Sequence, residues 1–237
     1  MSNSYFRFKE FTVQQDRCAM KITTDACLLG AWTPLPTAAA TALDIGTGTG
    51  LLALMLAQRN PALNIDAIEL DAEAAMQAAE NAAASPWANR ISVLQGDVCA
   101  YDFTKKYDVV ITNPPFFNSS LLGPDARRNN ARHTHRLPYP ALLQAIDGCL
   151  APGGYLSILL PVAEFAIWER HCAAHGWYNV GQLHICHRPS AAAKRIIGLF
   201  SRQSAPIASS DELTIYNTDG AYSADSSRLL GPYYLAL

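Results

Sequence analysis

The sequence predicts an α/β fold built on a doubly wound, mostly parallel sheet, and three features of the chain support this prediction. Apolar segments of strand length alternate with segments of helical periodicity, which is the order found in parallel sheets. A glycine-rich turn, GTGTG at residues 46–50, joins the first such strand to the first such helix. After residue 175, two apolar segments follow one another with only a short loop between them, which predicts an antiparallel hairpin at the sheet edge.

The core elements are assigned in chain order. The first strand contains Leu43 and Ile45, and apolar residues then recur at helical spacing from Leu51 to Leu56. The remaining strands are expected at residues 63–71, 90–98, 106–115, 155–162, 177–189 and 194–203, and the other helices at 72–85 and 139–154. These elements give a seven-stranded sheet with helices on both faces.

The chain shows no linker and no internal repeat, so we predict a single domain over residues 1–237. Residues 1–40 form an N-terminal extension, and the core covers residues 41–237. The C-terminal residues 213–237 have the pattern of a strand, a polar turn and an amphipathic segment.

The composition excludes several classes of protein. A net charge of −2 gives no overall attraction to nucleic acid or membrane, although a local basic cluster would still attract RNA. The six cysteines are scattered through a chain too long to need disulfides, so we expect reduced thiols in a cytoplasmic protein. Cys172, His175, His184 and Cys186 lack paired metal-ligand spacing, and we predict no metal site. No membrane span is expected, and the oligomeric state is left open with a monomer as the default.

A cofactor site is predicted at the carboxyl ends of the first three core strands. Gly46, Gly48 and Gly50 lie in the turn after the first strand, where glycine lets a ligand approach the main chain. Glu69 ends the second strand, where a carboxylate can accept both hydroxyl protons of a ribose. Asp97 follows the third strand, where the exocyclic amine of an adenine would need an acceptor. In open α/β sheets, ligands bind outside these strand ends.

Asp44 distinguishes between two cofactors. A carboxylate directly before the glycine turn suits a ligand that carries an ammonium group and suits the pyrophosphate of NAD poorly. The turn also lacks the full GxGxxG spacing of dinucleotide-binding loops. Both observations favour S-adenosylmethionine, and the alternative interpretation of Asp44 is a helix-capping or turn residue.

The tetrapeptide Asn113-Pro114-Pro115-Phe116 follows the fourth strand, beside the predicted cofactor site. Methylation of an exocyclic amine on a base requires a nitrogen whose lone pair is turned away from the ring. The Asn113 side-chain carbonyl and the Pro114 carbonyl can accept the two amine hydrogens, and the prolines hold both acceptors rigidly. Phe116 supplies a stacking face for the base. The alternative interpretation is a strand-ending turn with core aromatics.

Together, the segments DIGTGTG, IEL, GD and NPPF resemble the class I S-adenosylmethionine-dependent methyltransferases that modify amino groups. The segment QQDRCAMKITTDACLLGAW, with LLALMLAQR, SPWANRI and GAYS, is similar to the bacterial tRNA1(Val) adenine-N6 methyltransferase family, which acts at tRNA position 37. The resemblance covers nearly the whole chain. It implies a Rossmann-like fold, a tRNA substrate, and an N-terminal extension whose Thr24 and Asp25 lie over the cofactor site.

One residue departs from the family pattern, which has Tyr where this sequence has Phe116. The motif NPPF is also common among ribosomal RNA guanine-N2 enzymes, so a methyltransferase on another amine, including protein glutamine, is the alternative function. A protein without methyltransferase activity, such as a nucleotide oxidoreductase, is disfavoured because the glycine turn and NPPF are both intact.

A basic segment, residues 126–136, follows the NPPF motif and contains no acid. Its arginines are Arg127, Arg128, Arg132 and Arg136. We expect this segment at the rim of the site, where phosphate contacts position an RNA while the pocket selects one base. The alternative is an ordinary solvated loop.

Replacing Arg128 and Arg132 together by Ala should raise the Michaelis constant for tRNA. The slope of log binding constant against log salt should flatten by about 0.7–0.9 for each phosphate that the protein no longer neutralises. Binding isotherms at several salt concentrations measure this slope, and the affinity for S-adenosylmethionine serves as the control that stays constant. An unchanged slope would show that RNA is bound by another part of the surface.

Overall fold

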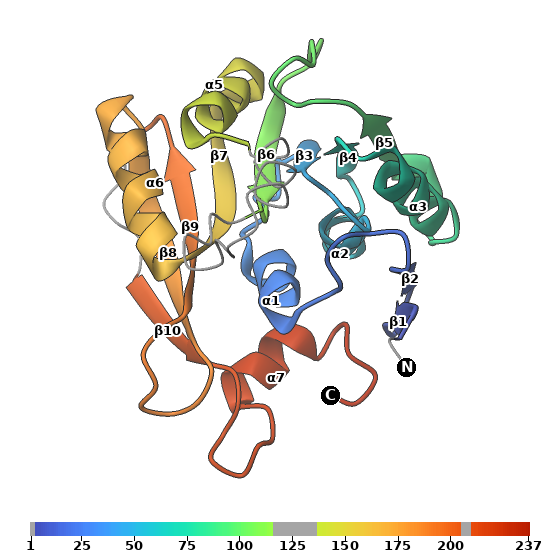
Figure 1. Cartoon of the computed structure of the whole chain (residues 1–237), viewed down its shortest axis with the longest axis vertical. Helices are drawn as coiled ribbons and strands as arrows, with labels where there is room; N and C mark the ends of the chain where they lie inside the picture. Colours follow the sequence, from blue (N-terminus) through green and yellow to red (C-terminus); the bar gives the residue numbers. More distant parts are fainter. Residues whose placement is uncertain (1–2, 116–136, 205–209) are drawn as a thin grey trace, which may run out of the picture.

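The predicted mixed sheet forms the centre of the molecule in a computed structural model, which describes residues 3–115, 137–204 and 210–237 (Figure 1). The strands are β1 (Tyr5–Arg7), β2 (Thr12–Gln14), β3 (Thr41–Ile45), β4 (Asn64–Glu69), β5 (Ile91–Gln95), β6 (Tyr107–Thr112), β7 (Leu150–Pro161), β8 (Tyr178–Cys186), β9 (Arg195–Ser201) and β10 (Ser210–Thr214). The large sheet has the order β10-β8-β9-β7-β6-β3-β4-β5, and β1 pairs with β2 separately. Of these eight strands, β9 runs antiparallel to the other seven.

Helices cover both faces of the large sheet, as predicted (Figure 1). They are α1 (Thr24–Trp32), α2 (Leu51–Arg59), α3 (Ala72–Ala83), the 3-10 turn η1 (Ala88–Arg90), α5 (Tyr139–Cys149), α6 (Val162–Ala174) and α7 (Ala224–Leu230). One hydrophobic cluster joins α1 and α2 to one face, and a second joins α5 and α6 to the other. Because side chains alternate along a strand, Leu43 and Ile45 of β3 enter the second cluster while Asp44 faces α2.

Two details of the predicted elements are wrong. Among the described residues, the sheet has eight strands rather than seven, because the C-terminal strand, β10, pairs in parallel with β8 outside the predicted hairpin. The strand expected from residue 213 begins at Ser210, because Ser210, Asp211 and Glu212 are exposed and give no apolar pattern before Leu213. The helix expected to close at Pro152 and Gly153 ends at Cys149, because β7 begins at the next residue and runs through a left-handed Gly153.

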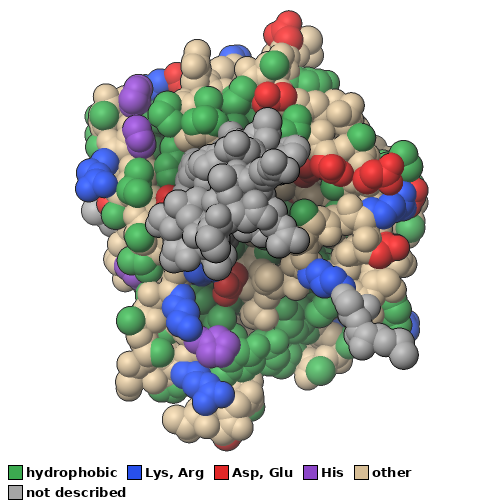
Figure 2. All heavy atoms as spheres, in the orientation of Figure 1, with side chains coloured by type: hydrophobic (Ala, Val, Ile, Leu, Met, Phe, Trp, Pro, Cys, Tyr) green, Lys and Arg blue, Asp and Glu red, His purple; other side chains and the backbone are tan. Residues whose placement is uncertain are grey.

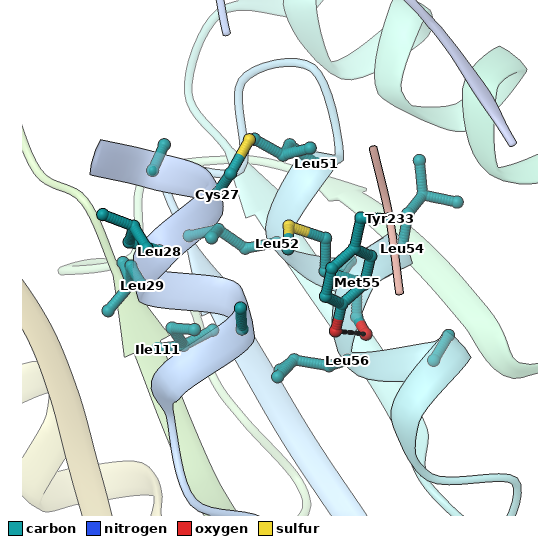
Figure 3. Packing of buried hydrophobic residues seen from close by; sticks show 14 of the residues in the cluster. Cys27, Leu28, Leu29, Leu51, Leu52, Leu54, Met55, Leu56, Ile111 and Tyr233 are labelled. Atoms are coloured by element: carbon teal, nitrogen blue, oxygen red, sulfur yellow. Dashed lines mark hydrogen bonds between the residues drawn. The ribbon is translucent and has the colours of Figure 1, made fainter. Parts of the chain in front are cut away.

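Helix α1 packs directly on α2 (Figure 3). Leu28 and Leu29 of α1 are fully buried, and Gly30 allows the close approach of the two helices, since a Cβ there would lie 2.8 Å from the sulfur of Met55. Tyr233, near the C-terminus, packs on the same helix and donates a hydrogen bond of 3.5 Å to the Met55 carbonyl oxygen. Segments from both ends of the chain therefore fix α2, the helix that follows the glycine turn.

A buried asparagine of α3 holds the N-terminal extension in place. Asn81 is 2% exposed, and its amide nitrogen donates to the carbonyl oxygens of Gln14 and Thr49, each at 2.9 Å. Its side-chain oxygen accepts from the Gln14 N–H at 2.9 Å. Gln77, one helical turn earlier, holds residues 16 and 17 in the same way. The extension is thereby tied both to α3 and to the glycine turn, in which Thr49 lies.

Within the described part of the chain, no helix has the length and apolar character needed to cross a membrane. All six cysteines are free, and four of them are buried, where they pack as small apolar side chains.

Gly198→Ala should lower the free energy of unfolding by about 1–3 kcal/mol, the usual cost of overpacking a core. A Cβ at this position in β9 would lie 2.4 Å from the Phe165 ring and 2.7 Å from the Phe200 ring. Urea unfolding measures the effect. The matched control is Gly148→Ala in α5, where a Cβ meets no atom within 4 Å and helix propensity should add up to about 1 kcal/mol. Equal effects of the two substitutions would contradict the packing argument.

Candidate functional site

The carboxyl ends of five parallel strands meet at one edge of the sheet. Ile45, the last residue of β3, lies opposite Ile68 of β4 on one side and Thr112 of β6 on the other. The segments that follow these strands are therefore neighbours. They carry most of the predicted site residues, namely Gly46, Gly48, Gly50, Glu69, Asp97, Asn113, Pro114 and Pro115. Asp44, the residue before Ile45, lies at the same edge.

The glycine turn forms an open cradle at this edge. Gly46, Gly48 and Gly50 have φ angles of +66°, +55° and +83°, in the left-handed region that favours glycine. A Cβ on Gly46 or Gly48 would meet no atom within 4 Å, whereas one on Gly50 would lie 3.5 Å from Ala78 of α3. The first two glycines therefore leave space for a ligand at the main chain, and the third allows α3 to pack closely.

Asp44 is a fully buried carboxyl group at the base of this cradle. One of its oxygens, Oδ2, accepts hydrogen bonds from the Thr47 hydroxyl at 2.5 Å and the Ala53 N–H at 3.2 Å. The other, Oδ1, has no hydrogen-bond partner among the described residues. Burial raises the pKa of Asp44 to about 7, although the two hydrogen bonds oppose the rise. A cationic group placed at Oδ1 would favour the charged carboxylate.

Glu69 and Asp97 are the other two predicted carboxylates, and both are more accessible than Asp44. Glu69 is half-buried and accepts from the N–H of Gly48 at 2.9 Å and from that of Asp71 at 3.1 Å. It is therefore fixed directly to the glycine turn. Asp97 is exposed and accepts from the Cys99 N–H at 2.9 Å. Each carboxylate keeps acceptor capacity for a ligand on the same edge.

Asn113 directly follows β6, the strand that pairs with β3. The Thr112 hydroxyl donates to the Ile45 carbonyl oxygen at 2.9 Å and fastens the end of β6 to that of β3. The side-chain oxygen of Asn113 is buried and has no hydrogen-bond partner among the described residues. Pro114 is buried and Pro115 exposed. The site thus contains two buried acceptor oxygens that have no partner among the described residues, one on β3 and one directly after β6.

Helix α1 begins near the same edge of the sheet, next to the end of β7 and the start of β9. The carboxylate of Asp25 lies 3.9 Å from Nε of Arg195, and Arg195 is paired with Pro161, the last residue of β7. Burial raises the pKa of Asp25, while the charge of Arg195 opposes the rise. The Thr24 side chain interacts with the hydroxyl of Tyr222. These contacts place the first turn of α1 beside the carboxyl end of β7 and the start of β9.

Four predicted site residues of the basic segment, Arg127, Arg128, Arg132 and Arg136, and the aromatic Phe116 lie outside the described residues. Among the residues that the structure does describe, no group of three or more His, Cys, Asp or Glu side chains could hold a metal ion.

Sequence reasoning missed the residues that support the site. Thr47 donates to Asp44, Asn81 of α3 joins the extension to the glycine turn, and Gln77 joins the extension to α3. The sequence does contain a signal for Gln77 and Asn81. They lie four residues apart in an alanine-rich helix, and this spacing places two polar side chains on one helix face.

The chain is similar to known methyltransferases in sequence and in structure. Residues 27–137 match the family model of the methyltransferase small domain. A protein of Dyadobacter fermentans is 44% identical over 98% of each chain, and one of Tolumonas auensis is 42% identical over 100% of this chain and 99% of its own. Both carry the name tRNA1(Val) (adenine(37)-N6)-methyltransferase.

Two solved structures show the same fold. A predicted O-methyltransferase from Agrobacterium tumefaciens aligns with a TM-score of 0.69 at 19% identity, over 88% of this chain and 96% of its own. An S-adenosylmethionine-dependent methyltransferase from Thiobacillus denitrificans, in complex with S-adenosyl-L-homocysteine, aligns with a TM-score of 0.50 at 20% identity, over 70% and 69% of the two chains.

Asp44→Asn should change how stability depends on pH. The pKa of Asp44 in the folded protein, about 7, lies above the value of about 3.9 expected for an unfolded chain, so ionisation opposes folding. The contribution of Asp44 to the free energy of unfolding should fall as pH rises from about 4 to 7 and stay level above. Urea unfolding of both proteins between pH 4 and 8 measures the difference. Parallel pH profiles would contradict the raised pKa.

Proposed function

The chain belongs to the family of tRNA1(Val) (adenine(37)-N6)-methyltransferases, and we propose that the carboxyl edge of its sheet performs that family's reaction, the transfer of a methyl group from S-adenosylmethionine to N6 of adenine 37 in tRNA. The observation that carries this assignment is the pair of buried oxygens on Asp44 and Asn113 that have no partner among the described residues, beside an open glycine cradle. Leaving a buried acceptor unsatisfied costs about 1–3 kcal/mol. Ligands that bring an ammonium group and an amine to this edge would remove both costs.

Four features of the chain fit S-adenosylmethionine, which when bound supplies a methyl group on a positively charged sulfur. The main chain at Gly46 and Gly48 is open to close approach. The free oxygen of Asp44 accepts the ammonium group, Glu69 the ribose hydroxyls, and Asp97 the adenine amine. We further propose that Thr24 and Asp25, within an extension over residues 1–40, cover this cofactor, since α1 begins at the same edge.

The target amine is held by the NPPF motif. The side-chain oxygen of Asn113 and the carbonyl oxygen of Pro114 accept its two hydrogens, which turns the nitrogen lone pair out of conjugation with the ring. Preorganised acceptors of this kind act where charge develops in the transition state. Phe116 stacks on the base. The amine loses a proton after the methyl group has been transferred, so the site needs no strong general base.

The tRNA contacts that we propose from the sequence are those of Arg127, Arg128, Arg132 and Arg136, as cations for the phosphates around the target. We also propose a single domain over residues 1–237 and a cytoplasmic location, in keeping with six free cysteines.

The direct test is methyl transfer from labelled S-adenosylmethionine to tRNA lacking the modification, followed by nucleoside analysis. N6-methyladenosine at position 37 of tRNA1(Val) is the expected product. A transcript in which that adenine is replaced by guanine should accept no label. Labelled N2-methylguanosine, or labelled protein in place of RNA, would reject the proposed substrate.

Asn113→Ala should lower the rate of methyl transfer by about 10²–10³, the usual effect of removing one preorganised hydrogen-bonding group. Its affinity for S-adenosylmethionine, measured by calorimetry, should stay near the parent value because Asn113 addresses the amine. The matched variant Asp44→Asn should show the opposite pattern, with the cofactor affinity reduced first. A variant at Asn113 that keeps half its activity would remove this residue from the mechanism.

A further inference from the structure

A second basic surface of the described chain lies at the same edge as the proposed catalytic residues. It is formed by the turn between β8 and β9 and by the C-terminal turn at residues 215–222, and we call it the hairpin surface. Its side chains are His187, Arg188, Lys194, Arg195, Tyr216 and Tyr222. Because β9 is antiparallel to β7, its first residue, Arg195, lies opposite the last residue of β7, Pro161.

Main-chain hydrogen bonds join the two turns into one unit. The N–H of Ile215 donates to the Cys186 carbonyl oxygen at 2.8 Å, and that of Tyr216 donates to the His187 carbonyl oxygen at 3.2 Å. The N–H of Ser223 then donates back to the Ile215 carbonyl oxygen at 2.9 Å, which closes the C-terminal turn. The main chains of the two turns are therefore held at fixed positions relative to one another.

A row of aromatic rings crosses this surface. The His187 and Tyr216 ring centroids are 5.1 Å apart, and those of Tyr216 and Tyr222 are 4.9 Å apart. His187 is exposed at the outer end of the row, and the two tyrosines are half-buried. At the inner end, the Tyr222 hydroxyl interacts with Thr24, at the start of α1. The row therefore runs from the exposed ring of His187 to Thr24, which we propose lies over the cofactor. The His187 ring packs against the ring of Tyr216.

Positive charges flank this row. Arg188 and Lys194 are exposed, and neither side chain has a hydrogen bond or ion pair with another described residue. Figure 2 shows Lys, Arg and His side chains gathered over the lower part of this face, on the side of β8 and β10, whereas Asp and Glu side chains gather over the α3 side. A molecule with a net charge of −2 thus presents a local positive surface beside its reaction edge.

We propose that the hairpin surface binds the unpaired nucleotides next to the methylated adenine, an assignment that rests on the proposed function. Arg188 and Lys194 contact phosphates, and His187, backed by Tyr216, stacks on one base. Cations beside aromatic faces are the combination that binds single-stranded nucleic acid, because every base offers a stacking face and every phosphate a charge. Unpaired loop nucleotides are the part of an RNA whose bases are free to stack on side chains.

The position of the surface in the sheet supports this partner. From β6, which ends at Thr112 directly before Asn113, the order of strands runs through β7 and β9 to β8. Thr112 lies opposite Ile158 of β7, and Arg195 lies opposite Pro161, three residues further along the same strand. With two strand spacings of about 4.8 Å and a rise of about 3.3 Å per residue, the start of β9 lies about 14 Å from the end of β6. A loop of RNA that presents one base to Asn113 can therefore place a nearby nucleotide on the hairpin surface.

The charge component is tested with Arg188→Ala/Lys194→Ala, using an anticodon stem-loop RNA as the probe. The dissociation constant should rise about tenfold at moderate salt, and the slope of log affinity against log salt should flatten by about 0.7 for each phosphate left without its cation. The affinity for S-adenosylmethionine should stay constant. Arg170→Ala, an exposed cation in the second half of α6, is the matched control and should leave both the affinity and the slope unchanged.

The stacking component is tested with a pair of substitutions at one position. His187→Ala should weaken RNA binding about tenfold with no change in salt slope, because stacking involves no counterion release. His187→Phe keeps the ring and should bind RNA as the parent protein does. A parent-like affinity and slope in Arg188→Ala/Lys194→Ala, or a parent-like affinity in His187→Ala, would overturn the inference.

The two proposals fail in different ways in these experiments. If the parent enzyme methylates adenine 37 while the alanine variants of the hairpin surface bind RNA normally, the reaction stands and the hairpin surface is rejected. If these variants lose RNA binding but the parent methylates no adenine, the hairpin surface stands as an RNA contact and the proposed reaction is rejected. Binding of an acidic protein at this surface in place of the stem-loop would reject the RNA assignment.

Discussion

The hydrogen-bond register of β3 with its two neighbours is the constraint on which the rest of the site depends. It aligns Ile45 with both Ile68 and Thr112, so three strands end at the same level. The Thr112 hydroxyl and the Glu69 carboxylate reinforce this alignment by bonding across strand ends, to the Ile45 carbonyl oxygen and the Gly48 N–H. A shift of one residue would turn Asp44 away from α2 and place an apolar side chain beside the glycine turn.

Two buried polar atoms at this edge lower the stability of the folded protein. Asp44 is completely buried yet keeps one oxygen without a partner among the described residues, and the same is true of the Asn113 side-chain oxygen. Such atoms work against folding, and the surrounding clusters of apolar side chains compensate for them. Proteins commonly retain this kind of cost at sites where a ligand completes the hydrogen bonding, because a fully satisfied site would gain little from binding.

The sequence predicted those parts of the molecule that depend on local pattern. The strand of Leu43 and Ile45, the glycine turn and the acids at strand ends all follow from short-range periodicity and residue chemistry. The C-terminal strand was expected from residue 213, but its place in the sheet could not be found in this way. Ser210, Asp211 and Glu212 are exposed, and they are held by pairing with β8, which is distant in the sequence. The attachment of Asn81 to Gln14 and Thr49 was hidden for the same reason, since each hydrogen bond joins residues more than thirty positions apart.

The antiparallel direction of β9 affects how the sequence of this enzyme can evolve. Because β9 runs against its neighbours, the turn that precedes it projects from the same edge as the loops of the parallel strands, without a crossover helix. Residues 187–194 lie outside the paired strands, and residues 187–192 are all exposed. Substitutions there can alter which RNA is held while the register of the reactive strands stays intact. Recognition and chemistry are thus encoded in segments that can diversify at different rates.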